Sequence, residues 1–328
     1  MPLDVGPATM RAAFAAVLDG GASDLEIGAL MAASTALEAR RDADGFAEII
    51  LGLSDAMRER MTPLIVDADS APIVVLPNYG NEDAFPATPL VALLLRRMGV
   101  RVLVHGAVET HGGLFNSSIL RELGILPATT RGQAEQRFSE DGLVVLPVTL
   151  FSPGLAAMLS LRNRLGICTP GHALANMLMP VVASSTRTLH VLQIAPWLTS
   201  RLIDESVVLE SPVLCVAAAG SSLGSVGGPA CLSFRDAESG AAWQTLFDSD
   251  GISPARGMQG TTNSGGAPDN HDPRAWATWT RQRLNGGSGL PMMVGHLFAC
   301  CLYGCGYAPD LNQAKAIVAM GAVNLAAA

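Results

Sequence analysis

Residues 72–106 read PIVVLPNYGNEDAFPATPLVALLLRRMGVRVLVHG, and this stretch decides the fold of the chain. It holds a short apolar run, a polar loop, a long apolar segment from Thr88-Pro89 to Gly99, and a second apolar run. Threonine followed by proline is typical of a helix start, and glycine is typical of a helix end. The order strand, helix, strand predicts two parallel strands that are joined by a crossover helix.

Short apolar runs of this kind recur along the chain, and helical patterns separate several of them. They are residues 72–76, 101–104, 143–148, 189–194 and 213–217. This alternation predicts an α/β fold with a mainly parallel central sheet, which helices cover on both faces. We expect residues 256–274, which are rich in Gly, Asn, Pro and Asp, to form a long loop, and residues 292–326 to form a helical pair.

The first part of the chain has a different pattern and predicts three helices. An apolar run over residues 10–18 stops at Gly20-Gly21, and Ser23 with Glu26 makes a capping box for the next helix. A third helix is expected over residues 44–60. Short amphipathic helices of this kind must pack on each other, on the rest of the chain or on a second copy.

The composition narrows the class of protein. Hydrophobic residues make up 49% of the chain and charged residues 15%, which excludes a disordered protein. No apolar run reaches the roughly 18–20 residues that cross a bilayer. A secretory signal requires a basic start, but no basic residue precedes Arg11. We therefore expect a cytoplasmic protein with no membrane contact. The six cysteines form no CxxC pair, which favours buried thiols over a metal site.

The charge balance bears on nucleic-acid binding. The formal net charge is −8, so the chain as a whole lacks a basic surface for nucleic acid. The one notable cluster of basic and aromatic residues consists of Arg274, Trp276, Trp279, Arg281 and Arg283. Arginine beside tryptophan can stack on bases, so the three arginines are candidate nucleic-acid contacts. The alternative is an amphipathic helix at the surface.

A first candidate ligand site is the loop that follows the first strand. It contains Asn78, Gly80 and Asn81 shortly before a helix, and such a loop presents free N–H groups to an anion. Glu82 and Asp83 in the same loop repel phosphate unless a cation intervenes. A purely structural turn is the alternative interpretation.

Two further candidate sites follow along the chain. His105-Gly106 ends the second strand, and the ends of such strands line the ligand crevice of open α/β sheets. Arg162 and Arg164 precede His172, but side chains two residues apart point to different sides of a helix. At most one of the two arginines is therefore expected to face a given site.

These segments, in this order, resemble anthranilate phosphoribosyltransferase and its relatives in glycosyltransferase family 3. Residues 161–169 read LRNRLGICT where the family has V-R-x-x-L-G-I-R-T, and His105-Gly106 match the H-G of K-H-G-N-R. The resemblance implies that Arg162 lies near the carboxylate of an aromatic acceptor. It also implies homodimers formed through a small helical domain. We place this domain at residues 1–68, with a later segment near 155–182 packing on it, and the α/β domain at residues 69–328.

The chain departs from the family at the groups that bind diphosphate and metal. The loop G-T-G-G-D-G falls on residues 77–82, where only Gly80 agrees, and Val104 replaces the lysine before H-G. The acidic pair that holds magnesium in the family falls on residues 221–225, which contain no carboxylate. Phosphoribosyl transfer depends on neutralising the departing charge, so we expect a degenerate site outside the tryptophan pathway.

Two hypotheses for the function remain open. The first is a family 3 glycosyltransferase-type protein that handles a sugar-phosphate ligand, with phosphoribosyl transfer as its reaction if it is active. No cofactor is certain; magnesium enters only with phosphoribosyl pyrophosphate, and Glu82, Asp83 or Glu109 are candidates for a substitute metal site. The second is a non-catalytic homodimer that binds nucleic acid or another polyanion. Pro77-x-Tyr79 and Gly171-His172 resemble a divergent paralogue branch of the family that includes nucleic-acid-binding members.

Overall fold

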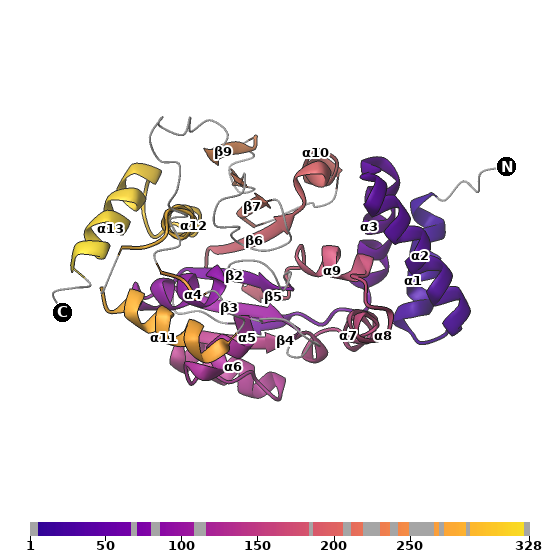
Figure 1. Cartoon of the computed structure of the whole chain (residues 1–328), viewed down its shortest axis with the longest axis horizontal. Helices are drawn as coiled ribbons and strands as arrows, with labels where there is room; N and C mark the ends of the chain where they lie inside the picture. Colours follow the sequence, from indigo (N-terminus) through magenta and orange to yellow (C-terminus); the bar gives the residue numbers. More distant parts are fainter. Residues whose placement is uncertain are drawn as a thin grey trace.

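The computed structural model describes residues 6–66, 71–79, 86–107, 116–183, 186–205, 211–218, 230–236, 242–248, 266–268, 272–286 and 289–324. Three helices form one end of the molecule: α1 (Pro7–Leu18), α2 (Asp24–Arg40) and α3 (Ala43–Arg58). The other elements surround a central sheet (Figure 1). The predicted α/β fold with a helical start is therefore confirmed.

Local signals explain where these helices begin. Pro7 occupies the first turn of α1, and the Asp42 side chain accepts a hydrogen bond from the backbone of Gly45 at the start of α3. The predicted capping box of α2 is confirmed, because Ser23 accepts from the Glu26 N–H and the Glu26 carboxylate accepts from the Ser23 N–H at 2.8 Å. These hydrogen bonds, with that of the Ser23 hydroxyl first, lower the pKa of Glu26.

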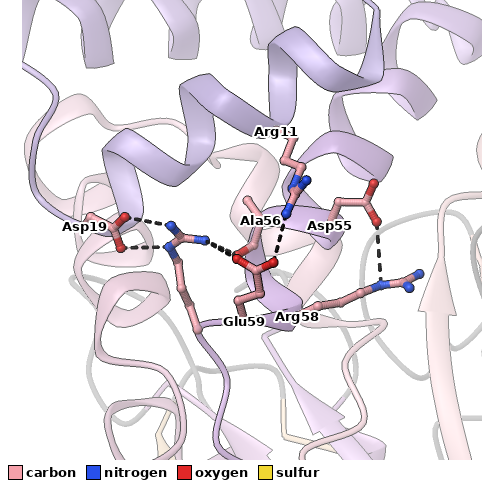
Figure 2. A network of polar contacts seen from close by, with 7 residues as sticks. Arg11, Asp19, Asp55, Ala56, Arg58 and Glu59 are labelled. Atoms are coloured by element: carbon pink, nitrogen blue, oxygen red, sulfur yellow. Dashed lines mark hydrogen bonds and ion pairs between the residues drawn. The ribbon is translucent and has the colours of Figure 1, made fainter.

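Ion pairs join the ends of α1 and α3, as Figure 2 shows. Arg60 donates to both carboxylate oxygens of Asp19 at 2.7 Å and to the carbonyl of Ala56 at 2.8 Å. Arg11 of α1 pairs with Glu59 at 2.9 Å. The hydrogen bond from Arg60 is the main cause that lowers the pKa of Asp19. Because Arg11, Asp19 and Glu59 are at least half exposed, these ion pairs add little to the stability.

The central sheet has seven strands in the order β4-β3-β2-β6-β7-β8-β9. Their bounds are β2 (Ile73–Asn78), β3 (Arg101–Gly106), β4 (Leu143–Pro147), β6 (Thr188–Ile194), β7 (Val213–Ala218), β8 (Ala230–Arg235) and β9 (Gln244–Asp248). Neighbours from β4 to β7 are parallel, whereas β8 and β9 are added antiparallel. All five predicted strands are confirmed, and β8 and β9 are additions that the sequence analysis missed.

Helices cover both faces of this sheet. One core joins the sheet to α4 (Ala87–Arg97), α5 (Asn116–Glu122), α11 (Pro273–Leu284), α12 (Met292–Gly304) and α13 (Leu311–Asn324). A second core joins the other face to the N-terminal helices and to α6 (Arg131–Asp141), α7 (Pro153–Ser160), α9 (Pro170–Ala175) and α10 (Pro196–Glu205). The two short helices η1 (Val148–Leu150) and α8 (Arg162–Leu165) flank α7. The alternation of side chains along β3 explains this division: Val102 and Val104 enter the first core and Leu103 the second.

The start of α4, the last two helices and the loop before them can be compared with the sequence predictions. The helix α4 begins at Ala87, so Thr88 lies inside its first turn and is not its N-cap; Pro86 already precedes the helix. The helical pair at the end of the chain is confirmed as α12 and α13. The predicted loop at residues 256–274 lies for the most part outside the described residues.

A second, smaller sheet links the N-terminal helices to the rest of the molecule. Its two parallel strands, β1 (Leu64–Val66) and β5 (Val181–Ala183), were not expected. Ile65 and Val182 pair across them and are both exposed. The α7 helix contacts α1, and α9 contacts α3. The domain boundary predicted at residue 68 lies outside the described residues. Within the described ranges, no helix combines the length and the apolar character that a membrane span needs.

Candidate ligand site at the carboxyl edge of the sheet

The carboxyl ends of β2 and β3 lie side by side. Asn78 pairs with Gly106, and Pro77 pairs with His105, in the parallel register of the two strands. A Cβ atom on Gly106 would lie 2.4 Å from the carbonyl oxygen of Asn78, which is closer than any real Cβ contact. Glycine is therefore required here, because the two strand ends approach each other directly.

His105 is fully buried at this edge. Its Nδ1 lies 3.1 Å from the Tyr79 hydroxyl, and the rings of Tyr79 and Phe151 stand edge-on to the imidazole at 5.4 and 6.0 Å between centroids. Burial, and then the nearby His190, lowers the pKa of His105 to about 3. Burial also raises the pKa of Tyr79 well above its ordinary value. Both groups are therefore neutral near neutral pH.

Several polar atoms near this edge are buried and find no hydrogen-bond partner in the described part of the chain. They are Asn78 Nδ2, Thr88 Oγ1, His105 Nε2, Asn116 Oδ1 and Ser117 Oγ. Asn78 and His105 belong to the strand ends, while Thr88 lies in the first turn of α4 and Asn116-Ser117 begin α5. Because α4 follows β2 and α5 follows β3, their first turns lie at the same edge of the sheet. Because buried polar groups almost always have partners, we treat this set as a candidate site for a polar ligand.

Arg162 and His172 come from a different segment, α8 and α9. The Thr169 N–H donates to Nδ1 of His172 at 3.1 Å, which places the proton of the neutral ring on Nε2. Burial, followed by the charge of Arg162, lowers the pKa of His172 to about 4. Arg164 points elsewhere and pairs with Asp24 of α2 at 3.6 Å. The two arginines thus lie on different sides, as their spacing predicts.

The α9 segment reaches the sheet at the carboxyl end of β6. There the Gln193 N–H donates to the carbonyl of Asn176, just after α9, at 3.0 Å. This bond brings the Arg162–His172 segment to the edge where β2 and β3 also end. The remaining predicted site residues, Gly80 and Asn81, lie outside the described residues, as do Glu82, Asp83 and Glu109. Among the residues whose positions are described, no group of three or more His, Cys, Asp or Glu is arranged to hold a metal ion.

The three arginines proposed for nucleic acid lie on α11 and engage the protein itself. Arg283 lies over the Trp279 ring at 5.1 Å and donates to the carbonyl of Gly289 at 2.8 Å. Arg281 donates to the carbonyl of Glu122 at 2.7 Å, and Arg274 pairs with the carboxylate of Glu122 at 3.6 Å. The indole rings of α11 are buried, at 6% exposed for Trp276 and 3% for Trp279. Their faces are therefore closed to a stacking base.

Thr88, Asn116 and Ser117 were not among the residues that the sequence analysis selected as candidate ligand contacts. Thr88 was assigned to a capping role because threonine before proline is a helix-start signal. The signal that identifies all three is their position, since each lies in the first turn of a helix that follows a buried parallel strand.

Comparisons with known proteins agree with this architecture. No family model matches the chain. An uncharacterized protein of Escherichia coli, YbiB, is 29% identical over 322 residues, which cover 96% of this chain and 93% of that protein. An anthranilate phosphoribosyltransferase of Halobacterium salinarum is 29% identical over 167 residues, which cover 50% of this chain and 47% of the enzyme.

Solved structures extend the likeness to almost the whole fold. The anthranilate phosphoribosyltransferase of Thermus thermophilus superposes with a TM-score of 0.69 at 20% identity, over 97% of this chain and 93% of that one. The enzyme of Saccharomyces cerevisiae in complex with PRPP and Mg gives 0.65 at 15% identity, over 99% and 92%. This chain is therefore similar to anthranilate phosphoribosyltransferases in sequence over half of its length and in fold over nearly all of it.

Proposed function

We propose that the protein binds a phosphorylated ribose ligand at the carboxyl edge of its sheet, and that this site no longer supports anthranilate transfer. The set of buried polar atoms without partners carries the proposal. Asn78 Nδ2 is a donor, and the hydroxyls of Thr88 and Ser117 can both donate and accept. Such groups match the hydroxyl and phosphate oxygens of a sugar phosphate. The yeast relative whose structure contains PRPP and Mg supports the choice of ligand class.

The loss of transfer rests on charge. The reaction of the family develops charge on a departing diphosphate, and catalysis depends on groups that neutralise it. Val104, where the family has a lysine, is fully buried and aliphatic. The polar atoms at the edge belong to amides, hydroxyls and a neutral imidazole. Mg²⁺ prefers carboxylate and phosphate oxygens, so this described donor set does not fit the metal, and any magnesium arrives with the ligand.

Calorimetry with phosphoribosyl pyrophosphate tests the proposal, with and without magnesium. We expect binding heat, together with no consumption of anthranilate when its fluorescence is followed. His105→Ala removes the buried imidazole and is expected to weaken binding about tenfold, in line with the loss of one buried hydrogen bond. His296→Ala is the matched control, since His296 stacks on Phe247 of β9 at 4.2 Å, and β9 is the outermost strand on the side of the sheet away from β2 and β3.

Three results would contradict the proposal. Absence of heat at millimolar ligand would remove the ligand class, and consumption of anthranilate would show that transfer has survived. Equal affinities of His105→Ala and wild type would place the ligand elsewhere in the molecule.

We also propose that two copies pair through the surface of α2. Only Met31 and Ser34 of this helix are buried, although it carries few charged residues. Leu25 is 84% exposed, and Leu165 of the neighbouring α8 is 43% exposed. The Arg164–Asp24 ion pair brings α8 beside the start of α2, and we propose that the two leucines contribute to one apolar surface. An apolar surface of this kind is typical of a protein interface.

A further inference from the structure

The two nitrogens of the His105 ring have different surroundings. Nδ1 lies 3.1 Å from the hydroxyl of Tyr79. Nε2 is buried and meets no hydrogen-bond partner among the described residues. The position of the ring proton therefore decides which chemical group the edge of the sheet offers to a ligand.

Counting unsatisfied atoms distinguishes the two tautomers. If Nδ1 carried the proton and donated to Tyr79, the Nε2 lone pair and the Tyr79 hydroxyl proton would both remain unsatisfied. If Tyr79 donates to Nδ1, only the proton on Nε2 lacks a partner. Because each buried polar group without a partner costs free energy, the second arrangement is favoured.

We infer that Tyr79 is a positioning residue whose hydroxyl donates to Nδ1 of His105 and thereby makes Nε2–H a fixed, buried donor for an anionic oxygen of the ligand. The identity of the ligand rests on the proposed function. The tautomer of His105 rests only on the geometry of the protein without a ligand. An N–H group donates to phosphate or carboxylate oxygens and makes no hydrogen bond with groups that can only donate. Tyr79 thus selects the ligand through His105 without a contact of its own.

The surroundings hold the ring in this orientation. Tyr79 and Phe151 stand edge-on to the imidazole, with interplanar angles of 62° and 73°, and Tyr79 is itself 4% exposed. A flip of the ring would exchange Nδ1 for a carbon and break the bond to Tyr79. In the described part of the chain, the titratable groups that act on His105 are Tyr79, directly after β2, and His190 on β6. Burial lowers the pKa of His190 to about 3, so neither neighbour carries charge near neutral pH.

The tautomer can be measured directly by ¹⁵N NMR of histidine-labelled full-length protein without ligand. His105→Asn assigns the signals of His105 among the six histidines of the chain. We expect an unprotonated Nδ1 and a protonated Nε2 in the wild type. In Tyr79→Phe, which keeps the ring but loses the hydroxyl, both nitrogen shifts should move toward the average of the two tautomers. The signals of His296 serve as the internal control. A purely packing role for Tyr79 would leave the His105 shifts unchanged.

A second measurement tests the donor. Phosphoribosyl pyrophosphate with magnesium, or inorganic pyrophosphate, is titrated while the Nε2–H signal is followed. We expect this signal to move on binding, and Tyr79→Phe to bind roughly 2- to 10-fold more weakly, as expected for one hydrogen bond.

The outcomes separate this inference from the proposed function. A proton on Nδ1 in the wild type, or unchanged shifts in Tyr79→Phe, would overturn the role of Tyr79 even if the ligand binds. Binding heat with an unmoved Nε2–H would overturn the donor role alone. If neither phosphoribosyl pyrophosphate with magnesium nor inorganic pyrophosphate gives binding heat, the proposed function and the donor role are both wrong. The ligand-free spectrum still decides the tautomer in that case. If Tyr79→Phe fails to fold, the wild-type spectrum alone decides the position of the proton.

Discussion

At the scale of single residues, three buried histidines dominate the electrostatics of the site. Burial is the main cause that lowers the pKa of His105 and of His190 to about 3 and that of His172 to about 4. In the unfolded chain, such rings take up protons below about pH 6.5. The folded protein therefore binds fewer protons than the unfolded chain between this pH and about pH 4.

This difference predicts acid sensitivity. The free energy of unfolding keeps its full value, as far as these rings are concerned, above about pH 6.5. Below this pH it decreases by about 1.4 kcal/mol per pH unit for each ring, because the unfolded chain binds the extra protons. Urea unfolding at pH 7.5, 6 and 5 measures the slope. His190→Val removes one of the three titrating groups and should flatten the slope by about a third. A free energy of unfolding that stays constant between pH 7.5 and 5 would contradict the burial of these rings.

His105 shows how far sequence reasoning reaches at this scale. Its place at the end of an apolar run predicts a position at the edge of the sheet, and β3 confirms this position. Its contact with Tyr79 was not predicted, because it depends on the pairing of Pro77 with His105 across two strands. The burial of Arg283 was also unexpected, because sequence alone places this side chain at the surface, whereas it lies over a tryptophan ring and donates to a main-chain carbonyl.

At the scale of elements, α1 and α3 cross at a glycine. A Cβ atom on Gly52 would lie 2.4 Å from Cβ of Met10 and 2.9 Å from the carbonyl oxygen of Pro7. We expect Gly52→Ala to destabilise the protein by about 1–3 kcal/mol through overpacking, despite the better helix propensity of alanine.

Gly28 is the matched control for this substitution. It also lies within a helix, α2, but a Cβ atom there meets nothing within 4 Å. Gly28→Ala should therefore stabilise the protein by about 0.5–1 kcal/mol. Chemical unfolding of both variants measures the difference. Similar effects of the two substitutions would show that the α1–α3 crossing is looser than the geometry indicates.

Strands were predictable where their own residues form an apolar run. The five parallel strands are buried on both faces, so each appears in the sequence as a largely apolar run. The β9 strand has the burial pattern exposed, exposed, buried, buried, exposed, and β1 and β5 are three residues long. Such segments become strands because a neighbouring strand supplies their hydrogen bonds, and this information is not local in sequence.

At the scale of the whole molecule, the surface of α2 predicts a dimer. Leu25→Glu combined with Leu165→Glu places two charges on this apolar surface and should convert the dimer to a monomer, because burying unpaired carboxylates is costly. Sedimentation velocity measures the change. Leu126→Glu is the control, as Leu126 is 53% exposed and precedes α6, in a different part of the chain. A wild-type protein that sediments as a monomer at all concentrations would contradict the proposal.

The fold as a whole was predictable because the order of helices and strands matches a known family, and solved structures of anthranilate phosphoribosyltransferases confirm it. The site was less predictable. We propose that Val104 and the segment around Asn78 depart from the family in the residues that determine chemistry, while β2 and β3, which carry them, keep their parallel pairing. A scaffold tolerates such changes because its stability depends on the buried faces and not on the loop residues.

The helices α7 and α9 pack on the N-terminal helices but are synthesised later on the ribosome. The α3 helix ends at Arg58, and α7 begins only at Pro153. At about 5–20 residues per second, translation leaves the first three helices without these partners for on the order of 5–20 s. During this interval the apolar side of α3 is open to other nascent chains, so we expect an early dependence on chaperones.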